Sequence, residues 1–242
     1  MRLDKYLCDM GAGTRSQVKQ KIRKGLVTLE GEKVTRPECQ VNPGQTVLVE
    51  GVPFIYTELE YYMLNKPAGC VSARTDGQCR TVLDLIVSKK RKDLFPVGRL
   101  DKDTEGLLLI TNDGKLAHRL LSPRHHVDKT YEAKIQGRVT EEHVKRFREG
   151  LDIGEERLTL PALLEILSSG EISCIRVTIQ EGKYHQIKRM FHAAGCEVLY
   201  LKRLSMGSLT LDESLQPGEY RPLTEEELAE LQNERKGEMD AV

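Results

Sequence analysis

Apolar residues recur at helical spacing at the start of the chain, at Leu3, Tyr6, Leu7 and Met10. Glycines follow and would end this first helix. Thr14 and Gln17 then form a capping-box pattern, which predicts a second helix that ends at Gly25. On this helix Val18 and Ile22 form an apolar strip, which we expect to pack on the first helix.

The same second helix carries a row of cations. Arg15, Lys19 and Arg23 recur at intervals of four beside the apolar strip. Short strands are predicted next, two within 27–34 and another at 46–50. Glycines and prolines up to Pro53 then punctuate the sequence, so residues 1 to about 57 form a candidate domain that displays a basic helix.

The remainder alternates strands and helices without a regular β-α-β rhythm. Period-two and apolar runs predict strands at 61–65, 107–111, 131–136, 158–166, 173–180 and 198–203. Helical patterns occupy 82–87, 115–121, 141–150, 185–194 and 225–232. Uneven connections favour an α+β domain with a mixed, largely antiparallel sheet over 61–232. The polar tail, 233–242, is expected to be disordered.

Composition restricts the class of protein. The 242 residues are 39% hydrophobic and 31% charged, which suits packed cores with a salt-rich surface. No apolar run approaches the roughly 18 residues of a membrane span. An acid, Asp4, stands where a signal peptide would begin its apolar stretch, so we expect a cytoplasmic protein.

The cysteines and histidines give no sign of a metal. No two of the six cysteines form a C-x-x-C pair, which indicates reduced thiols in a reducing compartment. His125 and His126 are adjacent, and His185 and His192 are too far apart for a helical pair of ligands. We therefore expect no metal site.

A formal net charge of zero conceals a polarity along the chain. Between Thr14 and Gly25 there are five basic residues and no acid, whereas from Glu213 onward nine acids face three bases. Such asymmetry indicates a polyanionic partner for the basic end.

The segment from Gly98 to Gly106, GRLDKDTEG, is a charged loop between two apolar stretches. A carboxylate at the mouth of a buried strand is fixed and partly desolvated, as a nucleophile or base requires. From the residues alone, a solvated loop that caps a strand is the simpler interpretation. A third takes Asp101, Asp103 and Glu105 as magnesium ligands, since alternating oxygen ligands suit a hard cation. No glycine-rich phosphate loop accompanies them.

Three other segments have both a structural and a functional interpretation. The stretch from Glu181 to Met190 leads from a strand into a helix, whose basic start could hold an anion or be a simple surface turn. Tyr131 would ordinarily be a half-buried strand aromatic. The basic run 89–92 is most often a solvated loop, and otherwise a phosphate-contacting patch.

Taken together, these blocks resemble a known family. Five occur in its order: Asn65-Lys66-Pro67-x-Gly69, Gly98-Arg99-Leu100-Asp101 through Gly106-Leu107, Asn112-Asp113-Gly114, Lys129-Thr130-Tyr131, and Glu181 to Met190. Residues 61 to about 232 thereby resemble the pseudouridine synthases that act on ribosomal RNA, in the branch that modifies the small subunit. Residues 1 to about 57 look like the S4 (αL-like) RNA-binding domain of that branch.

The resemblance implies roles for four residues. Asp101 matches the carboxylate that attacks the uridine, at C6 of the base or C1′ of the ribose. Lys188, where the family usually has arginine, matches the cation that pairs with it. Tyr131 matches the aromatic that stacks on the target base, and Arg99 would touch a neighbouring phosphate or fill the vacated stack. The reaction is an isomerisation, so the resemblance implies no cofactor.

The same resemblance implies the partner. We expect ribosomal RNA, either 16S rRNA with position 516 as the target or a small-subunit assembly intermediate, bound by a monomeric enzyme. The expected RNA contacts are Arg2, Arg15, Ser16, Lys19, Arg23, Lys24, Lys66, His185, Gln186 and Arg189. Three alternatives stay open: a 23S rRNA target, a non-catalytic S4-type assembly factor, and a magnesium-dependent enzyme on nucleic acid.

Overall fold

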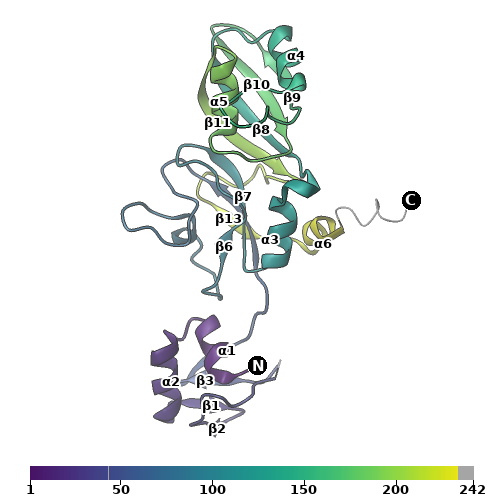
Figure 1. Cartoon of the computed structure of the whole chain (residues 1–242). Helices are drawn as coiled ribbons and strands as arrows, with labels where there is room; N and C mark the ends of the chain where they lie inside the picture. The colour runs from purple at the N-terminus through teal and green to yellow at the C-terminus, as the bar shows by residue number, and fades with distance from the viewer. Residues whose placement is uncertain (43, 234–242) are drawn as a thin grey trace, which may run out of the picture. The chain divides into compact units, whose positions relative to one another are not determined.

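The computed structural model describes residues 1–42 and 44–233, which form two compact units (Figure 1). One unit comprises residues 1–60 together with 86–94, and the other comprises 61–85 together with the chain from 95 onward. Of the expected tail, Asn233 ends a helix and the residues after it lie outside the described part.

The first unit packs two helices on a small antiparallel sheet. Its elements are α1 (Leu3–Asp9), α2 (Arg15–Arg23), β1 (Val27–Leu29), β2 (Glu32–Lys33), β3 (Val47–Val49) and β4 (Val52–Phe54), with strand order β2-β1-β3-β4. The expected capping box opens α2, because the Thr14 N–H donates to Gln17 Oε1 at 2.9 Å while Thr14 Oγ1 accepts from the Gln17 N–H. Val18 and Ile22 are fully buried against α1 residues, as the apolar strip predicts.

Strand β4 was not predicted, because the glycine and proline around it, Gly51 and Pro53, indicate a turn at the end of the domain. The strand pairs with β3 as the edge of the sheet, and Pro53 stands opposite Leu48. Proline lacks the N–H that a central strand must donate, but an edge strand has one side without a partner strand and tolerates it.

The segment 86–94 belongs to the first unit, although the sequence places it in the second domain. The Arg91 guanidinium is buried against Asp93 at 2.6 Å and Asp9 at 3.5 Å, so the suggested phosphate contact is wrong for this residue. The helix expected at 82–87 is only a 3₁₀ turn, η1 (Val82–Asp84). Val82 is buried within the second unit and Ile86 within the first.

The second unit is built on a mixed, largely antiparallel sheet, as expected. Its main path follows the order β13-β5-β7-β11-β8-β10-β9, with β6 beside β7 and β12 beside β11. The strands are β5 (Tyr61–Lys66), β6 (Phe95–Pro96), β7 (Glu105–Thr111), β8 (Lys129–Gln136), β9 (Leu163–Ser168), β10 (Ile172–Ile179), β11 (Glu197–Met206), β12 (Leu209–Thr210) and β13 (Tyr220–Pro222). The helices are η1, α3 (Gly114–Leu121), η2 (Pro123–His125), α4 (Glu141–Glu149), α5 (Gln186–Ala193) and α6 (Glu225–Asn233).

The strand expected at 158–166 begins only at Leu163. Thr159 is instead bonded to Leu151, through its N–H to the Leu151 carbonyl at 2.9 Å and through its hydroxyl to the Leu151 N–H at 3.0 Å. Pro161 has no N–H to give to a ladder. These residues therefore close a loop after α4 before the chain enters the sheet.

The two halves of this sheet meet where β7 and β11 run parallel. Gly106 pairs there with Arg203, and its φ of 98° is one that side-chain-bearing residues rarely adopt. A Cβ built on Gly106 would lie 2.2 Å from the Arg203 carbonyl oxygen, so only glycine allows this approach. The charged loop 98–106 ends at this junction.

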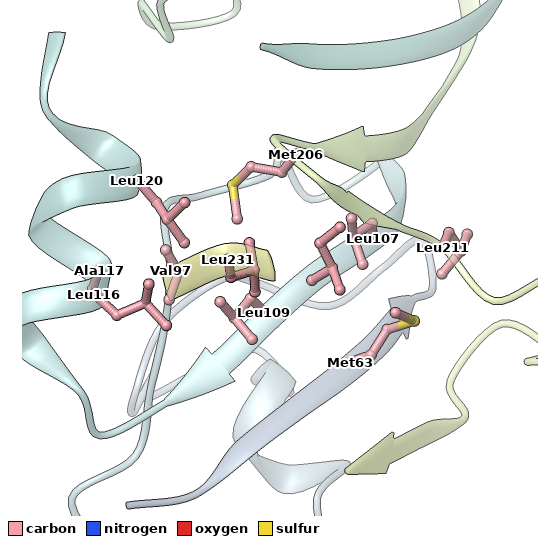
Figure 2. Close-up of a cluster of buried hydrophobic side chains, with 11 residues drawn as sticks. Met63, Val97, Leu107, Leu109, Leu116, Ala117, Leu120, Met206, Leu211 and Leu231 are labelled. Atoms are coloured by element: carbon pink, nitrogen blue, oxygen red, sulfur yellow. The ribbon is translucent and has the colours of Figure 1, made fainter. Parts of the chain in front are cut away.

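Apolar packing fixes the strand that follows the charged loop. β7 is buried on both faces, and its Leu107 and Leu109 belong to a core cluster with α3 and α6 (Figure 2). Leu116 and Leu120 of α3 and Leu231 of α6 close this cluster. The start of β7 is thereby a rigid base for the charged loop.

In the other half, helices cover one face of the sheet. Alternate residues of β8 and β10 are buried on this face, and the intervening ones are half-buried or exposed. α4 packs against β9 and α5 against β11, and Phe147 and Phe191 bring the two helices together with ring centroids 4.8 Å apart (Figure 1). Tyr131 lies on the same face and is also buried.

Candidate active site

The charged loop is held from beneath by the block that begins at Asn65. The Gly69 N–H donates to the Lys102 carbonyl at 2.7 Å, and the Ser72 hydroxyl donates to the Leu100 carbonyl at 2.9 Å. The Leu100 N–H returns a bond to the same hydroxyl at 3.1 Å. These bonds hold the backbone on both sides of Asp101, and Ser72 is an anchor that the motif pattern did not reveal.

Lys66 is the deepest of these anchors, and the expectation that it contacts RNA is wrong. Its side chain is fully buried, and Nζ donates to the carbonyls of Thr104 at 2.8 Å, Pro67 at 3.0 Å and Lys102 at 3.3 Å. Burial lowers the pKa of Lys66 from 10.5 to about 8, against the opposing influence of nearby acids. The lysine thus binds the loop to β5.

Lys66→Met keeps the shape of the side chain but removes its donors. We expect the activity of this site to fall about tenfold or more, because small displacements of a catalytic group are costly. Stability should change by less than about 2 kcal/mol at neutral pH, since relief of a buried charge offsets the unpaired carbonyls. Chemical denaturation and turnover at saturating RNA measure the two effects.

A pH series of this variant supplies its control. Between about pH 8 and 10.5 the unfolded chain binds the Lys66 proton and the native chain does not, so the free energy of unfolding should rise with pH. Lys66→Met loses the contribution of Lys66 to this rise and keeps that of Lys129, whose pKa burial also lowers to about 8. Parallel pH profiles for the wild type and the variant would contradict the placement of Lys66.

Asp101 lies beside two groups from the start of α5. Lys188 Nζ is 3.3 Å from Asp101 Oδ2, and His185 Nε2 is 3.5 Å from Asp101 Oδ1. Lys188 also binds Asp103, with Nζ 2.6 Å and 2.9 Å from its two carboxylate oxygens. One ammonium group therefore joins α5 to two carboxylates of the charged loop.

Electrostatics keep this pairing in its charged form. Burial disfavours the Lys188 ammonium, but its hydrogen bond to Asp103 and the charges of Asp101 and Asp103 outweigh burial and raise the pKa of Lys188. The hydrogen bond from Lys188 lowers the pKa of Asp103. A fixed positive charge therefore lies beside Asp101.

A pocket of about 70 Å³ opens over Asp101. Arg99 of the charged loop, Tyr131 of β8, and His185 and Lys188 at the start of α5 all line it, so residues far apart in sequence meet there. Ile179 and Leu201 complete its wall, which sequence reasoning did not identify because they read as ordinary strand residues. The pocket joins an aromatic ring, apolar surface, cations and one carboxylate.

Two residues expected to contact RNA also stabilise the turn before α5. Gln186 is 4% exposed, its amide donates to Glu181 at 2.7 Å, and its oxygen accepts from the Lys183 N–H at 2.9 Å. The Arg189 guanidinium binds Glu155 at 2.7 Å and the carbonyls of Tyr184 and Ile153. Both side chains therefore have partners within the chain, and their contact with RNA stays a prediction.

The three acids of the loop do not form the donor set of a magnesium site. The Lys188 ammonium lies between Asp101 and Asp103, and Glu105 accepts a hydrogen bond from the Tyr200 hydroxyl at 2.8 Å. Within residues 1–42 and 44–233, no group of three histidines, cysteines or acids is arranged to hold a metal ion.

In the same described ranges, no helix is long and apolar enough to cross a membrane.

The first unit presents its cations unevenly. Arg2 forms a two-fold hydrogen bond with the buried Asp4, at 3.0 Å for each contact, and Arg15 lies 4.0 Å from the same carboxylate. Arg23 and Lys24 are exposed at the end of α2, where Ser16 and Lys19 also lie at the surface or half-buried. The exposed basic end of α2 is therefore the better phosphate-binding surface, and Arg2 is already engaged.

Both units of the chain match known protein families. A model of the RNA pseudouridylate synthase family matches residues 60–193, and an S4 domain model matches residues 1–47. YtzG of Bacillus subtilis (strain 168), described as an uncharacterized RNA pseudouridine synthase, is 50% identical over 94% of this chain and 97% of its own. Ribosomal small subunit pseudouridine synthase A of Vibrio cholerae is 42% identical over 96% of this chain and 99% of its own.

A solved structure agrees with these sequences. It is a crystal structure of pseudouridylate synthase that aligns with a TM-score of 0.68 at 40% identity, covering 96% of this chain and 99% of the other. The resemblance drawn from five sequence blocks is confirmed, together with the S4 domain and the α+β fold class. The chain belongs to the RNA pseudouridylate synthase family and is a pseudouridine synthase, an isomerase, with an N-terminal S4 domain.

Proposed function

We propose that this enzyme converts a specific uridine of small-subunit ribosomal RNA to pseudouridine, with Asp101 as the catalytic carboxylate. One observation carries the assignment. Asp101 is the carboxylate that lines the pocket of the second unit, with Lys188 3.3 Å away and Tyr131 in the same wall. A charged nucleophile, its paired cation and an aromatic platform thus face one small cavity.

The reaction needs no group beyond the chain. Asp101 attacks the uridine at C1′ of the ribose or at C6 of the base, and the bond between N1 and C1′ breaks. The detached uracil turns so that C5 forms the new bond to C1′. C5 then loses its proton, N1 gains one, and the carboxylate is released. Because atoms and electrons balance within the nucleotide, we propose that the enzyme acts without a cofactor.

The other pocket residues support this chemistry. Lys188 orients the Asp101 carboxylate before attack, through the 3.3 Å ion pair between Lys188 Nζ and Asp101 Oδ2. Tyr131 provides a face on which the flipped uracil stacks, which offsets part of the cost of leaving the RNA stack. Arg99, exposed at the rim, binds a neighbouring phosphate or fills the space that the uridine leaves.

Replacement of Tyr131 tests the stacking role. Tyr131→Phe keeps the aromatic face and should retain most activity, whereas Tyr131→Leu should lose about fivefold or more, since base–aromatic stacking contributes about 1–3 kcal/mol. The two variants are matched in burial and lack the same hydroxyl. Turnover of saturating RNA measures the difference, and equal rates for Phe and Leu would exclude stacking as the role of Tyr131.

The relatives and the S4 domain support our proposal for the substrate. Relatives at 41–42% identity over nearly their whole length are named for the small ribosomal subunit. We propose 16S rRNA, with position 516 as the target, either free or within an assembling particle. The proposal includes a cytoplasmic, monomeric enzyme. In vitro modification of 16S and 23S rRNA in parallel tests it, and pseudouridine formed only in 23S rRNA would transfer the assignment to the alternative.

The basic helix α2 should supply sequence-independent affinity. Lys19→Ala with Arg23→Ala should weaken RNA binding and lower the slope of log affinity against log salt by about one to two, because each phosphate contact releases counterions. Lys145→Ala with Arg148→Ala on α4 is a matched control, since both of its cations are exposed on a helix of the other unit. If the slope of log affinity against log salt falls equally in the α2 and α4 double variants, α2 does not make the phosphate contacts.

A further inference from the structure

A pair of stacked aromatic rings lies at the rim of the catalytic pocket. Tyr184 and His185 precede α5, and their ring centroids are 3.8 Å apart with an angle of 18° between the ring planes. His185 lines the pocket, and its Nε2 is 3.5 Å from Asp101 Oδ1. The two rings therefore lead outward from the catalytic carboxylate, with His185 on the inside and Tyr184 beyond it.

The fold of the turn before α5 produces this stack. His185 has φ 48° and ψ 35°, a left-handed conformation that few residues other than glycine adopt. Hydrogen bonds hold the turn on both sides, because Arg189 Nη1 donates to the Tyr184 carbonyl at 3.0 Å and the Gln186 N–H donates to the Lys183 carbonyl at 3.2 Å. The position of the Tyr184 ring is thus set by the backbone.

Tyr184 differs from the other aromatic residues in its exposure. Its side chain is 71% exposed, whereas every other tyrosine and phenylalanine within residues 1–42 and 44–233 is buried or half-buried. His185 covers one face of the ring, so the outer face is turned to solvent. Aromatic rings usually stabilise a protein through the large apolar area that they bury. A flat partner on the outer face of Tyr184 would bury this area.

A nucleobase has the shape and chemistry of such a partner. Unstacked RNA bases stack on tyrosine rings, and this stacking tolerates any base because every base has a π face. A uridine in the pocket is joined to its neighbour by one phosphodiester, so the neighbour lies at the rim. Only the thickness of the His185 ring lies between Tyr184 and the pocket lining.

We propose that the outer face of Tyr184 binds the base of a nucleotide adjacent to the target uridine. The base, Tyr184 and His185 then form one continuous stack that ends beside Asp101. Tyr184 holds the RNA strand at the pocket and takes no part in the chemistry, unlike Tyr131, which lines the pocket itself. The inference rests on the proposed function, because it assumes an RNA substrate in this pocket.

Two full-length variants separate stacking from a structural role. Tyr184→Phe keeps the ring and Tyr184→Leu removes it, and both lack the hydroxyl. With a 16S rRNA transcript, Tyr184→Leu should raise Kd and KM about fivefold or more, as expected for one lost stack, and Tyr184→Phe should match the wild type. If Tyr184 only held His185 beside Asp101, Tyr184→Leu would lower kcat and leave Kd unchanged. That result, or equal Kd values for the two variants, would overturn the inference.

A fluorescent base reports the stack directly. Two transcripts carry 2-aminopurine, which is quenched when it stacks, on the 5′ or the 3′ side of the target uridine. At saturating protein, one of the two complexes should fluoresce more with Tyr184→Leu than with the wild type or Tyr184→Phe. Equal fluorescence with all three proteins on both transcripts, while the wild type forms pseudouridine, would overturn the inference and leave the proposed function standing. If the wild type forms no pseudouridine, the proposed function fails first.

Discussion

Asp101→Asn should reduce pseudouridine formation by about a thousandfold or more while RNA affinity and folding survive. An amide of nearly the same shape is a poor nucleophile and a poor base. Asp101 is only partly buried, and Lys188 retains its 2.6 Å contact with Asp103 when the carboxylate of Asp101 is lost. The loop therefore stays anchored in the variant, and only the chemistry is removed.

Neighbouring acids provide the controls for this variant. Asp103→Asn and Glu105→Gln should each retain substantial activity, because neither carboxylate attacks the uridine. Asp103 positions Lys188, and Glu105 binds the Tyr200 hydroxyl. A magnesium-dependent enzyme would need all three acids together, and a binding-only protein would need none of them. Assays with and without EDTA, on proteins of equal thermal stability, separate the three outcomes.

Gly106→Ala should cause the largest loss of stability of any single substitution considered. The new Cβ would lie 2.2 Å from the Arg203 carbonyl oxygen and 2.8 Å from its nitrogen, at a φ that alanine rarely adopts. Both contacts are with backbone, so relief requires β7 and β11 to separate. We expect a loss of about 3 kcal/mol or more in the free energy of unfolding, together with loss of activity.

The matched control for this substitution is Gly114→Ala. Gly114 begins α3, has no positive φ, and a Cβ there would meet nothing within 4 Å. Its replacement should be neutral or slightly stabilising, because alanine restricts the unfolded chain. Denaturant titration of both variants measures the contrast. Equal midpoints for Gly106→Ala and the wild type would show that β7 and β11 do not meet as closely as described.

Local sequence patterns predicted most of the helices and strands, because contacts between residues near in sequence determine these elements. The Thr14–Gln17 capping box, the apolar strip of α2 and the alternation along β8 each depend on near neighbours in the chain. Predictions were wrong where long-range contacts decide the conformation. The turn at Val82 and the late start of β9 at Leu163 are such cases, since burial in two units and bonds to Leu151 override local preference.

The candidate site divides in the same way. Motif order brought Asp101, Lys188 and Tyr131 forward, and the structure places all three around one pocket. Motif order could not distinguish a surface cation from a buried anchor. Lysine is usually a surface residue, but the side chain of Lys66 is fully buried. The close approach at Gly106 was equally hidden, since the residue opposite lies 97 positions later in the sequence.

Pseudouridine mapping in ribosomal RNA tests the central claim most directly. The host strain would lack the chromosomal copy of this protein and carry either the wild-type chain or Asp101→Asn. The account predicts that one small-subunit position, 516 of 16S rRNA, loses pseudouridine in the deletion strain. The wild-type chain should restore the modification, whereas Asp101→Asn, expressed at the same level, should not. Full modification restored by Asp101→Asn would contradict the account.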